Sequence, residues 1–250
     1  MWSFLYGQNH GKVEIILDNA PARSAELLAQ DRVDAALVPV IAYQMIENVR
    51  LIPDVCVGAR ERVRSVCLIT KGKGLADVRS VALDISSRTS VVLTKIIFRE
   101  FLGFEPEWKD ASPAIEVMLA DSDAALLIGD PALRLSALSA GSAYRKFDLA
   151  ELWHQHTGLG FVFAMWMTRQ ERCGIDFAAA RDEGLAHLDG IIANYETDIR
   201  LGPDEMRKYL SQDISYSVDD SMRRGMDMYF DLAAKNKLIS ENKTLLFVGS

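Results

Sequence analysis

The 250-residue sequence has no run of about 20 uninterrupted apolar residues, which is the length that a membrane-spanning helix needs. Its opening residues lack the basic segment and the long apolar segment of a secretory signal, so we expect a cytoplasmic location. Basic residues are also in deficit, because 28 lysines and arginines face 35 aspartates and glutamates, for a net charge of −7. This acidic balance argues against nucleic acid as a partner, although local arginines can still bind a small anion.

Cysteine and histidine are scarce. The three cysteines are odd in number and far apart, so they do not predict a disulfide framework. The four histidines lie outside any HExxH or cysteine-rich pattern, so we expect no metal site. We interpret His154 and His156 as surface or packing residues.

What the sequence does contain is an alternation of short apolar runs with segments of helical periodicity. Strands are predicted at residues 13–17, 33–39, 55–57, 65–70, 81–83, 124–128 and 161–167, with a further extended piece at Trp108. Helical segments are predicted between them, and helices dominate from Asp176 onward, with a break near Gly190. Such alternation is typical of an α/β fold with largely parallel sheets.

Two features favour a division into two lobes. The glycine- and lysine-rich residues 71–74 interrupt the first α/β run, and a second run follows to about residue 160. If the chain then returns through residues 161–167, it crosses between lobes twice, near Thr70 and near Phe161. We therefore expect lobe 1 to comprise residues 1–72 and 161–250, ending in a helical tail, and lobe 2 to comprise residues 73–160.

One stretch, residues 81–90, combines a strand with a hydroxyl-rich turn at the start of a helix. The first turn of a helix has backbone N–H groups without partners and a partial positive charge. Ser87, Thr89 and Ser90 add hydroxyl donors, and Arg88 can grip a carboxylate or phosphate with two bonds. The alternative is a capped helix with a solvated arginine.

Ligands in open α/β sheets bind beyond the carboxyl ends of strands. Ser65, residues 86–90 and Asp130 all lie where a predicted strand begins or ends, so we expect them to converge on a cleft between the lobes. Arg60, Arg62 and Arg64 are further candidates for holding an anion, or else are solvated charges of a loop.

Several blocks, in this order, resemble chorismate dehydratase of the futalosine route to menaquinone: residues 31–39 (DRVDAALVP), 58–66 (GARERVRSV), 83–90 (LDISSRTS), 123–133 (DAALLIGDPAL), 148–153 (DLAELW) and 157–166 (TGLGFVFAMW). The resemblance implies the two-lobed fold of type II periplasmic binding proteins. It also implies a carbon–oxygen lyase that removes water from chorismate to give 3-[(1-carboxyvinyl)oxy]benzoate, without metal or organic cofactor. A small anionic substrate is thus the expected partner, and the oligomeric state stays open.

The resemblance also implies roles for individual residues. Ser65 would contact the substrate as the catalytic candidate, or else bond to nearby backbone. Residues 87–90 would hold a carboxylate of the substrate. Asp130 would orient the substrate or cap the helix at Pro131, and Tyr43 would line the cleft or simply be half-buried.

The sequence departs from that family in two places. Trp2 is normally preceded there by a first strand and a Leu-Asn turn whose asparagine touches the substrate, so we expect this strand and asparagine to be missing. The loss of such a strand would expose an edge in the first lobe. Gly160 stands where proline is usual, which loosens the predicted hinge.

Two other functions stay open. One is the later menaquinone step that forms 1,4-dihydroxy-6-naphthoate, which suits a histidine base near the cleft, whereas the matching blocks contain no histidine. The other is a non-catalytic receptor for a small anion. Tight binding of chorismate without turnover would favour this alternative.

Overall fold

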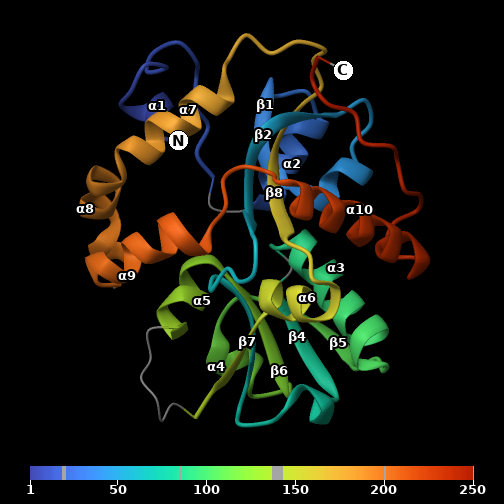
Figure 1. Cartoon of the computed structure of the whole chain (residues 1–250). Helices are drawn as coiled ribbons and strands as arrows, with labels where there is room; N and C mark the ends of the chain where they lie inside the picture. The colour runs from blue at the N-terminus through green and yellow to red at the C-terminus, as the bar shows by residue number, and fades with distance from the viewer. Residues whose placement is uncertain (19–20, 85, 137–142, 200, 250) are drawn as a thin grey trace.

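Two β-sheets, one above the other in Figure 1, form the cores of the molecule, and helices surround them. The computed structural model describes residues 1–18, 21–84, 86–136, 143–199 and 201–249. The strands are β1 (Ala35–Pro39), β2 (Arg50–Ala59), β3 (Val66–Thr70), β4 (Ser80–Asp84), β5 (Glu107–Ala111), β6 (Ala124–Ile128), β7 (Arg145–Asp148) and β8 (Phe161–Thr168). The predicted two-lobed α/β fold is confirmed.

The helices also follow the order expected from the sequence. The α-helices are α1 (Trp2–Leu5), α2 (Pro21–Ala29), α3 (Arg88–Ile96), α4 (Ile115–Met118), α5 (Gly129–Ser136), α6 (Leu149–Thr157), α7 (Phe177–Ala186), α8 (Leu188–Ile199), α9 (Pro203–Lys208) and α10 (Asp220–Lys235). Short 3₁₀ segments are η1 (Val40–Gln44) and η2 (Leu75–Asp77), and π-helical turns are η3 (Ile97–Leu102) and η4 (Tyr209–Asp213). The break between α7 and α8 falls at His187 and not at Gly190.

The strand directions differ from the prediction of largely parallel sheets, which is wrong. The upper sheet has the order β1-β8-β2, and β8 runs antiparallel to both neighbours. The lower sheet has the order β5-β4-β6-β3-β7, in which β4 is parallel to β5 and β6 while β3 is antiparallel to β6 and β7. The reason is the double crossing: the chain enters the lower sheet through β3 and returns to the upper sheet through β8, so each of these strands runs against its neighbours.

The first crossing lies earlier than predicted. The boundary after residue 72 assigns β3 to the first lobe, which is wrong, because β3 pairs with β6 and β7 in the lower sheet. The crossing therefore lies between Ala59 and Val66, and residues 71–74 form a turn inside the lower lobe, where the Thr70 hydroxyl donates to the Lys73 carbonyl at 2.6 Å. Apart from this change, the lobe boundaries stay a prediction.

Residues 13–17, predicted as a strand, are irregular in the structure. Ile16 and Leu17 are 55% and 67% exposed. A strand needs a neighbour to accept its backbone hydrogen bonds, and among the described residues β1 pairs with β8 alone. The sequence also gave no sign of β7, a short, charged strand at the sheet edge.

Helix α10 packs directly on the two crossing segments. A Cβ atom added to Gly225 of this helix would lie 2.0 Å from the Gly160 carbonyl oxygen, and one added to Gly58 would lie 2.2 Å from the Met222 side chain. The buried Trp153 donates from its indole N–H to the same Gly160 carbonyl at 3.2 Å. The absence of side chains at these glycines therefore lets helix and hinge approach closely.

A C-terminal strap, defined here as residues 242–248, runs along the outer edge of β2. Leu51 of β2 donates to the Leu246 carbonyl at 2.8 Å, and Val248 donates to the Leu51 carbonyl at 2.9 Å. The Tyr43 hydroxyl donates to the Thr244 carbonyl at 2.6 Å and accepts from the Leu246 N–H at 2.8 Å. The strap thus covers one edge of the upper sheet.

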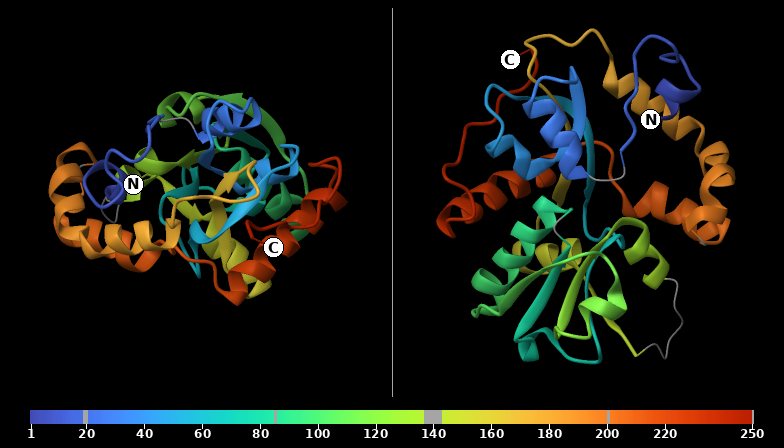
Figure 2. Two further views of the ribbon diagram at one scale, coloured as in Figure 1. Left: turned by 90° about the horizontal axis from the view of Figure 1, so that it is seen from above. Right: turned by 180° about the vertical axis from the view of Figure 1, so that it is seen from behind.

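A helical arm, comprising α7, α8, α9 and η4, runs down one side of the molecule from the upper lobe to the lower lobe (Figures 1 and 2). The arm packs against α5 through a small apolar cluster of buried side chains: Leu133, Ile192, Leu201 and Met206. The predicted helical tail therefore contacts both lobes.

Candidate functional site

Three predicted site segments meet at one edge of the lower sheet. Because β4 and β6 are parallel and β3 runs against them, the ends of β4 and β6 and the start of β3 share the edge that faces the upper sheet (Figure 1). Residues 86–90 follow β4, Gly129 and Asp130 follow β6, and Ser65 precedes β3. The Gly129 N–H donates to the Ser65 carbonyl at 2.7 Å. With a strand spacing of about 4.8 Å, the serine-rich turn and Ser65 are roughly 10 Å apart.

The turn at residues 86–90 is shaped by Asp84, a buried carboxylate at the end of β4. Its Oδ1 accepts from the Ser86 N–H at 3.0 Å and from the Ser86 hydroxyl at 2.6 Å. Ser87 is the residue before α3, and its hydroxyl donates to the Ser90 hydroxyl at 2.7 Å. This pair of buried hydroxyls lies in the first turn of α3, where the helix dipole favours an anion. Ile85 lies outside the described residues.

Thr89 and Arg88 have their polar contacts outside this turn. The Ile41 N–H, just after β1, donates to the Thr89 hydroxyl at 3.3 Å, so Thr89 joins the turn to the upper lobe. The Arg88 side chain is 38% exposed, and its Nη2 lies 3.3 Å from a carboxylate oxygen of Glu26 on α2. The structure therefore gives Arg88 a carboxylate from this chain as its partner.

Ser65 is 6% exposed, and it is among the polar groups that influence the Tyr209 side chain of η4. Burial raises the pKa of Tyr209 to about 12, against the opposing effects of Ser65 and Arg64, and the carboxylates of Asp130 and Asp213 raise the pKa further. Tyr209 is therefore a neutral hydroxyl at neutral pH. Tyr209 was not among the candidate site residues predicted from the sequence.

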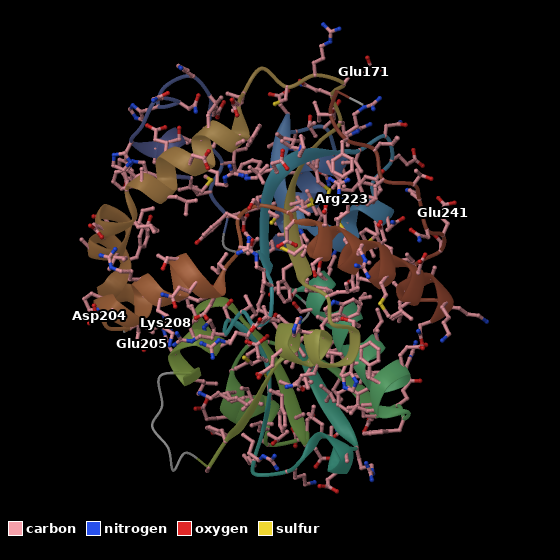
Figure 3. All side chains as sticks on the ribbon, in the orientation of Figure 1. Glu171, Asp204, Glu205, Lys208, Arg223 and Glu241 are labelled. Carbon is pink, nitrogen blue, oxygen red and sulfur yellow. The ribbon has the colours of Figure 1, made fainter. Side chains whose placement is uncertain are left out.

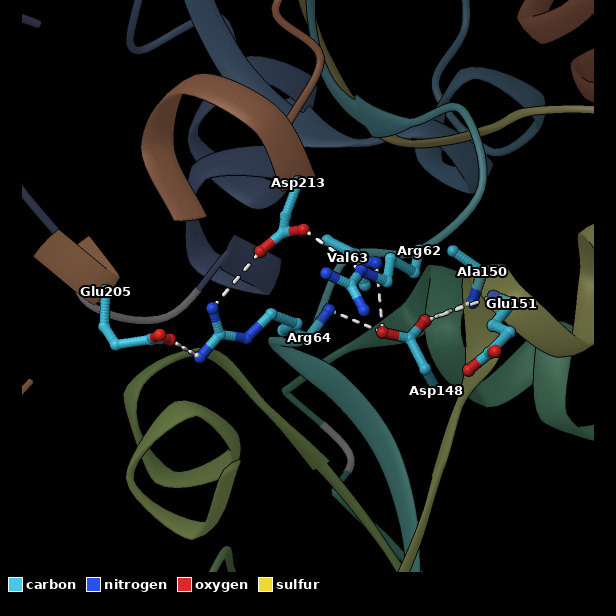
Figure 4. A network of polar contacts seen from close by, with 8 residues as sticks. All are labelled: Arg62, Val63, Arg64, Asp148, Ala150, Glu151, Glu205 and Asp213. Carbon is cyan, nitrogen blue, oxygen red and sulfur yellow. Dashed lines mark hydrogen bonds and ion pairs between the residues drawn. The ribbon is translucent and has the colours of Figure 1, made fainter. Parts of the chain in front are cut away.

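The three arginines of the first crossing form ion pairs, shown in part in Figure 4. Arg64 contacts Asp213 at 3.3 Å and Glu205 at 2.8 Å, and Arg62 contacts Asp213 at 3.2 Å. Asp213 is nearly buried, with 4% of its side chain exposed. Arg60 pairs with Asp219 at 2.9 Å. Each of these arginines thus has a carboxylate of this chain as its partner. The side chains of Arg60 and Arg62 are still 68% and 49% exposed, as expected for solvated charges, whereas that of Arg64 is 15% exposed.

Asp148 fixes the same crossing from the other side (Figure 4). Its Oδ2 accepts from the N–H groups of Val63 and Arg64 at 3.0 and 2.5 Å. Its Oδ1 accepts from the N–H groups of Ala150 and Glu151 at 2.9 and 3.2 Å, which caps α6. Burial raises the pKa of Asp148, against these four hydrogen bonds. Arg64 has φ +63°, a left-handed conformation that these contacts hold in place.

Asp130 and Tyr43 differ from their predicted surroundings. Asp130 is exposed and lies inside the first turn of α5, which begins at Gly129, so it is not the residue that precedes the helix. Tyr43 is 2% exposed, and both hydrogen bonds of its hydroxyl go to the strap. The structure therefore brings Ser65, Asp130 and residues 86–90 to one sheet edge, and assigns Tyr43 to the packing of the strap.

The residues that sequence reasoning missed are those of the arm. Glu205, Tyr209 and Asp213 recur every four residues, a spacing that places them on one helical face and that the sequence does contain. No pattern shows, however, that this face meets a loop about 150 positions earlier in the chain.

A cavity of about 450 Å³ lies between α10 and the strap, lined by Arg223, Asp227 and Phe230 among others. Among residues 1–18, 21–84, 86–136, 143–199 and 201–249, no three His, Cys, Asp or Glu side chains gather in a way that could hold a metal ion. Within the same residues, no helix has the length and apolar character to cross a membrane.

Solved structures show which class of protein this fold defines. Protein AF1704 from Archaeoglobus fulgidus aligns with a TM-score of 0.65 and 16% identity, over 95% of this chain and 94% of that chain. The periplasmic aliphatic sulphonate binding protein SsuA from Escherichia coli aligns with a TM-score of 0.57 and 15% identity, over 89% and 77% of the two chains. The chain therefore has a periplasmic-binding-protein-like fold, as the resemblance implied.

The family follows from sequence. A family model described as menaquinone biosynthesis matches residues 2–235, so the chain belongs to that family. A chorismate dehydratase from Thermus thermophilus is 30% identical over 233 residues, which cover 86% of this chain and 84% of that protein. The family resemblance predicted from the ordered blocks is confirmed.

Proposed function

We propose that this chain is a chorismate dehydratase, a carbon–oxygen lyase of menaquinone biosynthesis that converts chorismate to 3-[(1-carboxyvinyl)oxy]benzoate. The observation that supports this most is the 30% identity to the Thermus thermophilus chorismate dehydratase over most of both chains. The fold adds support, because its class includes binding proteins for small anions such as the sulphonate binding protein. A cytoplasmic location accompanies this proposal.

The reaction needs little beyond orientation and proton transfer. The substrate ring loses a proton from the carbon that bears the ether and a hydroxyl group from the neighbouring carbon, so water is released and the ring becomes aromatic. No electrons are exchanged with another molecule. The protein therefore has to bind the two carboxylates of chorismate, orient its ring and exclude bulk water.

Two parts of the sheet edge suit these tasks. The first turn of α3, with the hydroxyls of Ser87 and Ser90, would hold one carboxylate. Ser65, opposite this turn, would contact the ring, and Asp130 would orient it. Thr89 would close the turn against the upper lobe through its bond with Ile41. We leave Tyr43 out of this proposal, since the strap takes both hydrogen bonds of its hydroxyl.

Arg88 would bind a carboxylate of the substrate only if its guanidinium group leaves the carboxylate of Glu26. Arg88→Ala should then raise KM for chorismate by about 10-fold, the value of a charge-assisted hydrogen bond. Glu26→Ala frees the guanidinium and should leave KM equal or lower. An Arg88→Ala variant with an unchanged KM would remove Arg88 from the site.

The direct test is an assay of the purified protein, both as the 250-residue chain and with any in-frame upstream segment, on chorismate. Ultraviolet absorbance and chromatography should show the aromatic product. Ser65→Ala should lower kcat/KM by at least 10-fold, whereas Ser240→Ala, at an exposed serine, should not. Absence of product from both forms contradicts the proposal, and tight binding of chorismate without turnover would favour an anion receptor instead.

A further inference from the structure

Asp148 ends the edge strand β7, and its carboxylate accepts four hydrogen bonds from two separate segments (Figure 4). One oxygen caps α6, and the other accepts from the N–H groups of Val63 and Arg64, which lie 85 and 84 positions earlier in the chain. Serine and asparagine, each with one acceptor oxygen, cap helices as well as aspartate does. The cap alone therefore does not require the second oxygen.

The segment that this second oxygen holds is a tight turn around Arg64. The Ser65 N–H donates to the Val63 carbonyl at 2.8 Å, a bond that spans a single residue, and Arg64 between them has φ +63°. A γ-turn whose central residue has a positive φ is the rare and strained form. Such strain persists where surrounding contacts hold it, and it is found mainly at functional sites.

Every backbone N–H and C=O group of this turn has a partner. The Arg64 carbonyl accepts from the Cys67 thiol at 3.3 Å, and the Ser65 carbonyl accepts from the Gly129 N–H at 2.7 Å. Asp148 is the partner from outside the crossing segment for the first half of the turn, and Gly129 is the one for the second half. The place of Ser65 at the sheet edge therefore depends on both.

The Arg64 side chain leads from the same turn to the helical arm. Its guanidinium group pairs with Glu205 at 2.8 Å and with Asp213 at 3.3 Å. Glu205 and Lys208 are labelled on the lower end of the arm in Figure 3. These ion pairs reach only the tip of a long side chain, whereas the Asp148 carboxylate binds the backbone beside Ser65. The backbone position of Ser65 thus depends on Asp148 more directly than on the arm.

We propose that Asp148 is a positioning residue for the dehydration, because its second carboxylate oxygen holds the strained turn that places Ser65 beside the substrate ring. The inference rests on the proposed function. Since β7, β3 and β4 belong to one sheet, the bond fixes Ser65 in the same lobe as the turn at residues 86–90. Without it, Arg64 is free to relax to a commoner φ, and Ser65 moves with it. A displacement of about 1 Å is enough to slow a reaction strongly.

Asp148→Asn and Asp148→Ser separate the two roles of this side chain. Each keeps one oxygen to cap α6, and neither can also accept from the two N–H groups of the turn. Both variants should lower kcat for chorismate by about 10-fold with less than a twofold change in KM, because the turn that binds the substrate carboxylate is unchanged. The matched control is Asp176→Asn at the exposed cap of α7, where the carboxylate accepts from the Ala179 N–H, and it should match the wild type.

A double-mutant cycle with Ser65→Ala shows whether the effect passes through Ser65. Asp148→Asn should lower kcat by less than twofold when residue 65 is already alanine. A merely structural role would reduce the amount of folded protein by the same factor in both backgrounds. The rates are therefore normalised to the folded fraction, measured by circular dichroism at the assay temperature.

Two results overturn the inference: wild-type kcat in both Asp148 variants, or equal losses of kcat with and without the Ser65 hydroxyl. If Asp148→Asn does not fold, the cycle is repeated with Asp148→Ser, and failure of both to fold makes the carboxylate structural and the inference wrong. A wild type that binds chorismate without converting it contradicts the proposed function only, and the cycle is then measured on dissociation constants. A wild type that neither binds nor converts chorismate overturns both.

Discussion

The two sides of the proposed site are built in different ways. On the α3 side, Asp84, Ser86, Ser87 and Ser90 bind one another over two or three positions of the chain. On the Tyr209 side, the contact between Arg64 and Asp213 joins residues 149 positions apart. The α3 side therefore follows from local sequence, whereas the Tyr209 side exists only when the helical arm is docked.

This difference has a consequence for stability as well as for the site. Local turns form wherever their own strand and helix form, but the end of the arm that docks on the lower lobe, α9 and η4, depends on a few ion pairs and a small apolar cluster. Segments with few buried contacts open at lower free energy than the core. We expect the Tyr209 side to be the more easily disrupted of the two.

The largest effect should come from Asp213→Ala, which breaks the Tyr209 side. Asp213 is nearly buried and pairs with both Arg62 and Arg64, so its removal leaves a largely buried guanidinium with Glu205 alone. The free energy of unfolding should fall by about 3 kcal/mol. Lys208→Ala, at an exposed position of the same arm, should change the free energy of unfolding by less than about 0.5 kcal/mol. Both free energies are measured by denaturant titration. Equal values for the two variants would mean that the ion pairs do not hold the arm.

The matching change on the α3 side is Asp84→Ala. It leaves the Ser86 N–H and hydroxyl without their acceptor, which should lower the free energy of unfolding by about 2 kcal/mol and raise KM for chorismate. Asp84→Asn keeps one carbonyl oxygen and should lose less. Asp213→Ala should lower the free energy of unfolding by the same amount in the wild type and in the Asp84→Ala background, and a different loss there would show that the two sides are not independent.

A smaller effect should appear at alkaline pH. The pKa of Tyr209 rises to about 12 in the folded chain, mainly through burial, whereas an unfolded tyrosine has a pKa of about 10. The unfolded state therefore loses this proton first, so the contribution is complete below about pH 10 and is lost as the pH rises through about 12. Between pH 9 and 10.5 the wild type should lose about 1 kcal/mol relative to Tyr209→Phe, measured by denaturant unfolding at each pH. Parallel curves for the two proteins would contradict the burial of this hydroxyl.

The same division, between local contacts and contacts of distant segments, separates what the sequence predicts from what it does not. The strand at β4, the hydroxyl-rich turn and the start of α3 were predictable, because a buried run and a helix start are local signals. The strand predicted at residues 13–17 was wrong, since an apolar run does not reveal whether a neighbour is there to pair with it. The location of β3 in the lower sheet, the partner of Arg88 and the ion pair of Arg64 with Asp213 are contacts between distant segments, which one sequence does not display.

The strap bears on how the protein is handled in the laboratory. It hydrogen-bonds to Leu51 and to the Tyr43 hydroxyl, and so occupies backbone groups of β2 that would otherwise be free. A deletion of residues 242–248 would leave those groups exposed, and an unpaired strand edge recruits strands from other molecules. A purification tag is therefore better placed after a spacer beyond residue 250 than in exchange for the strap, and a shortened version should be checked for self-association before any loss of activity is attributed to the site.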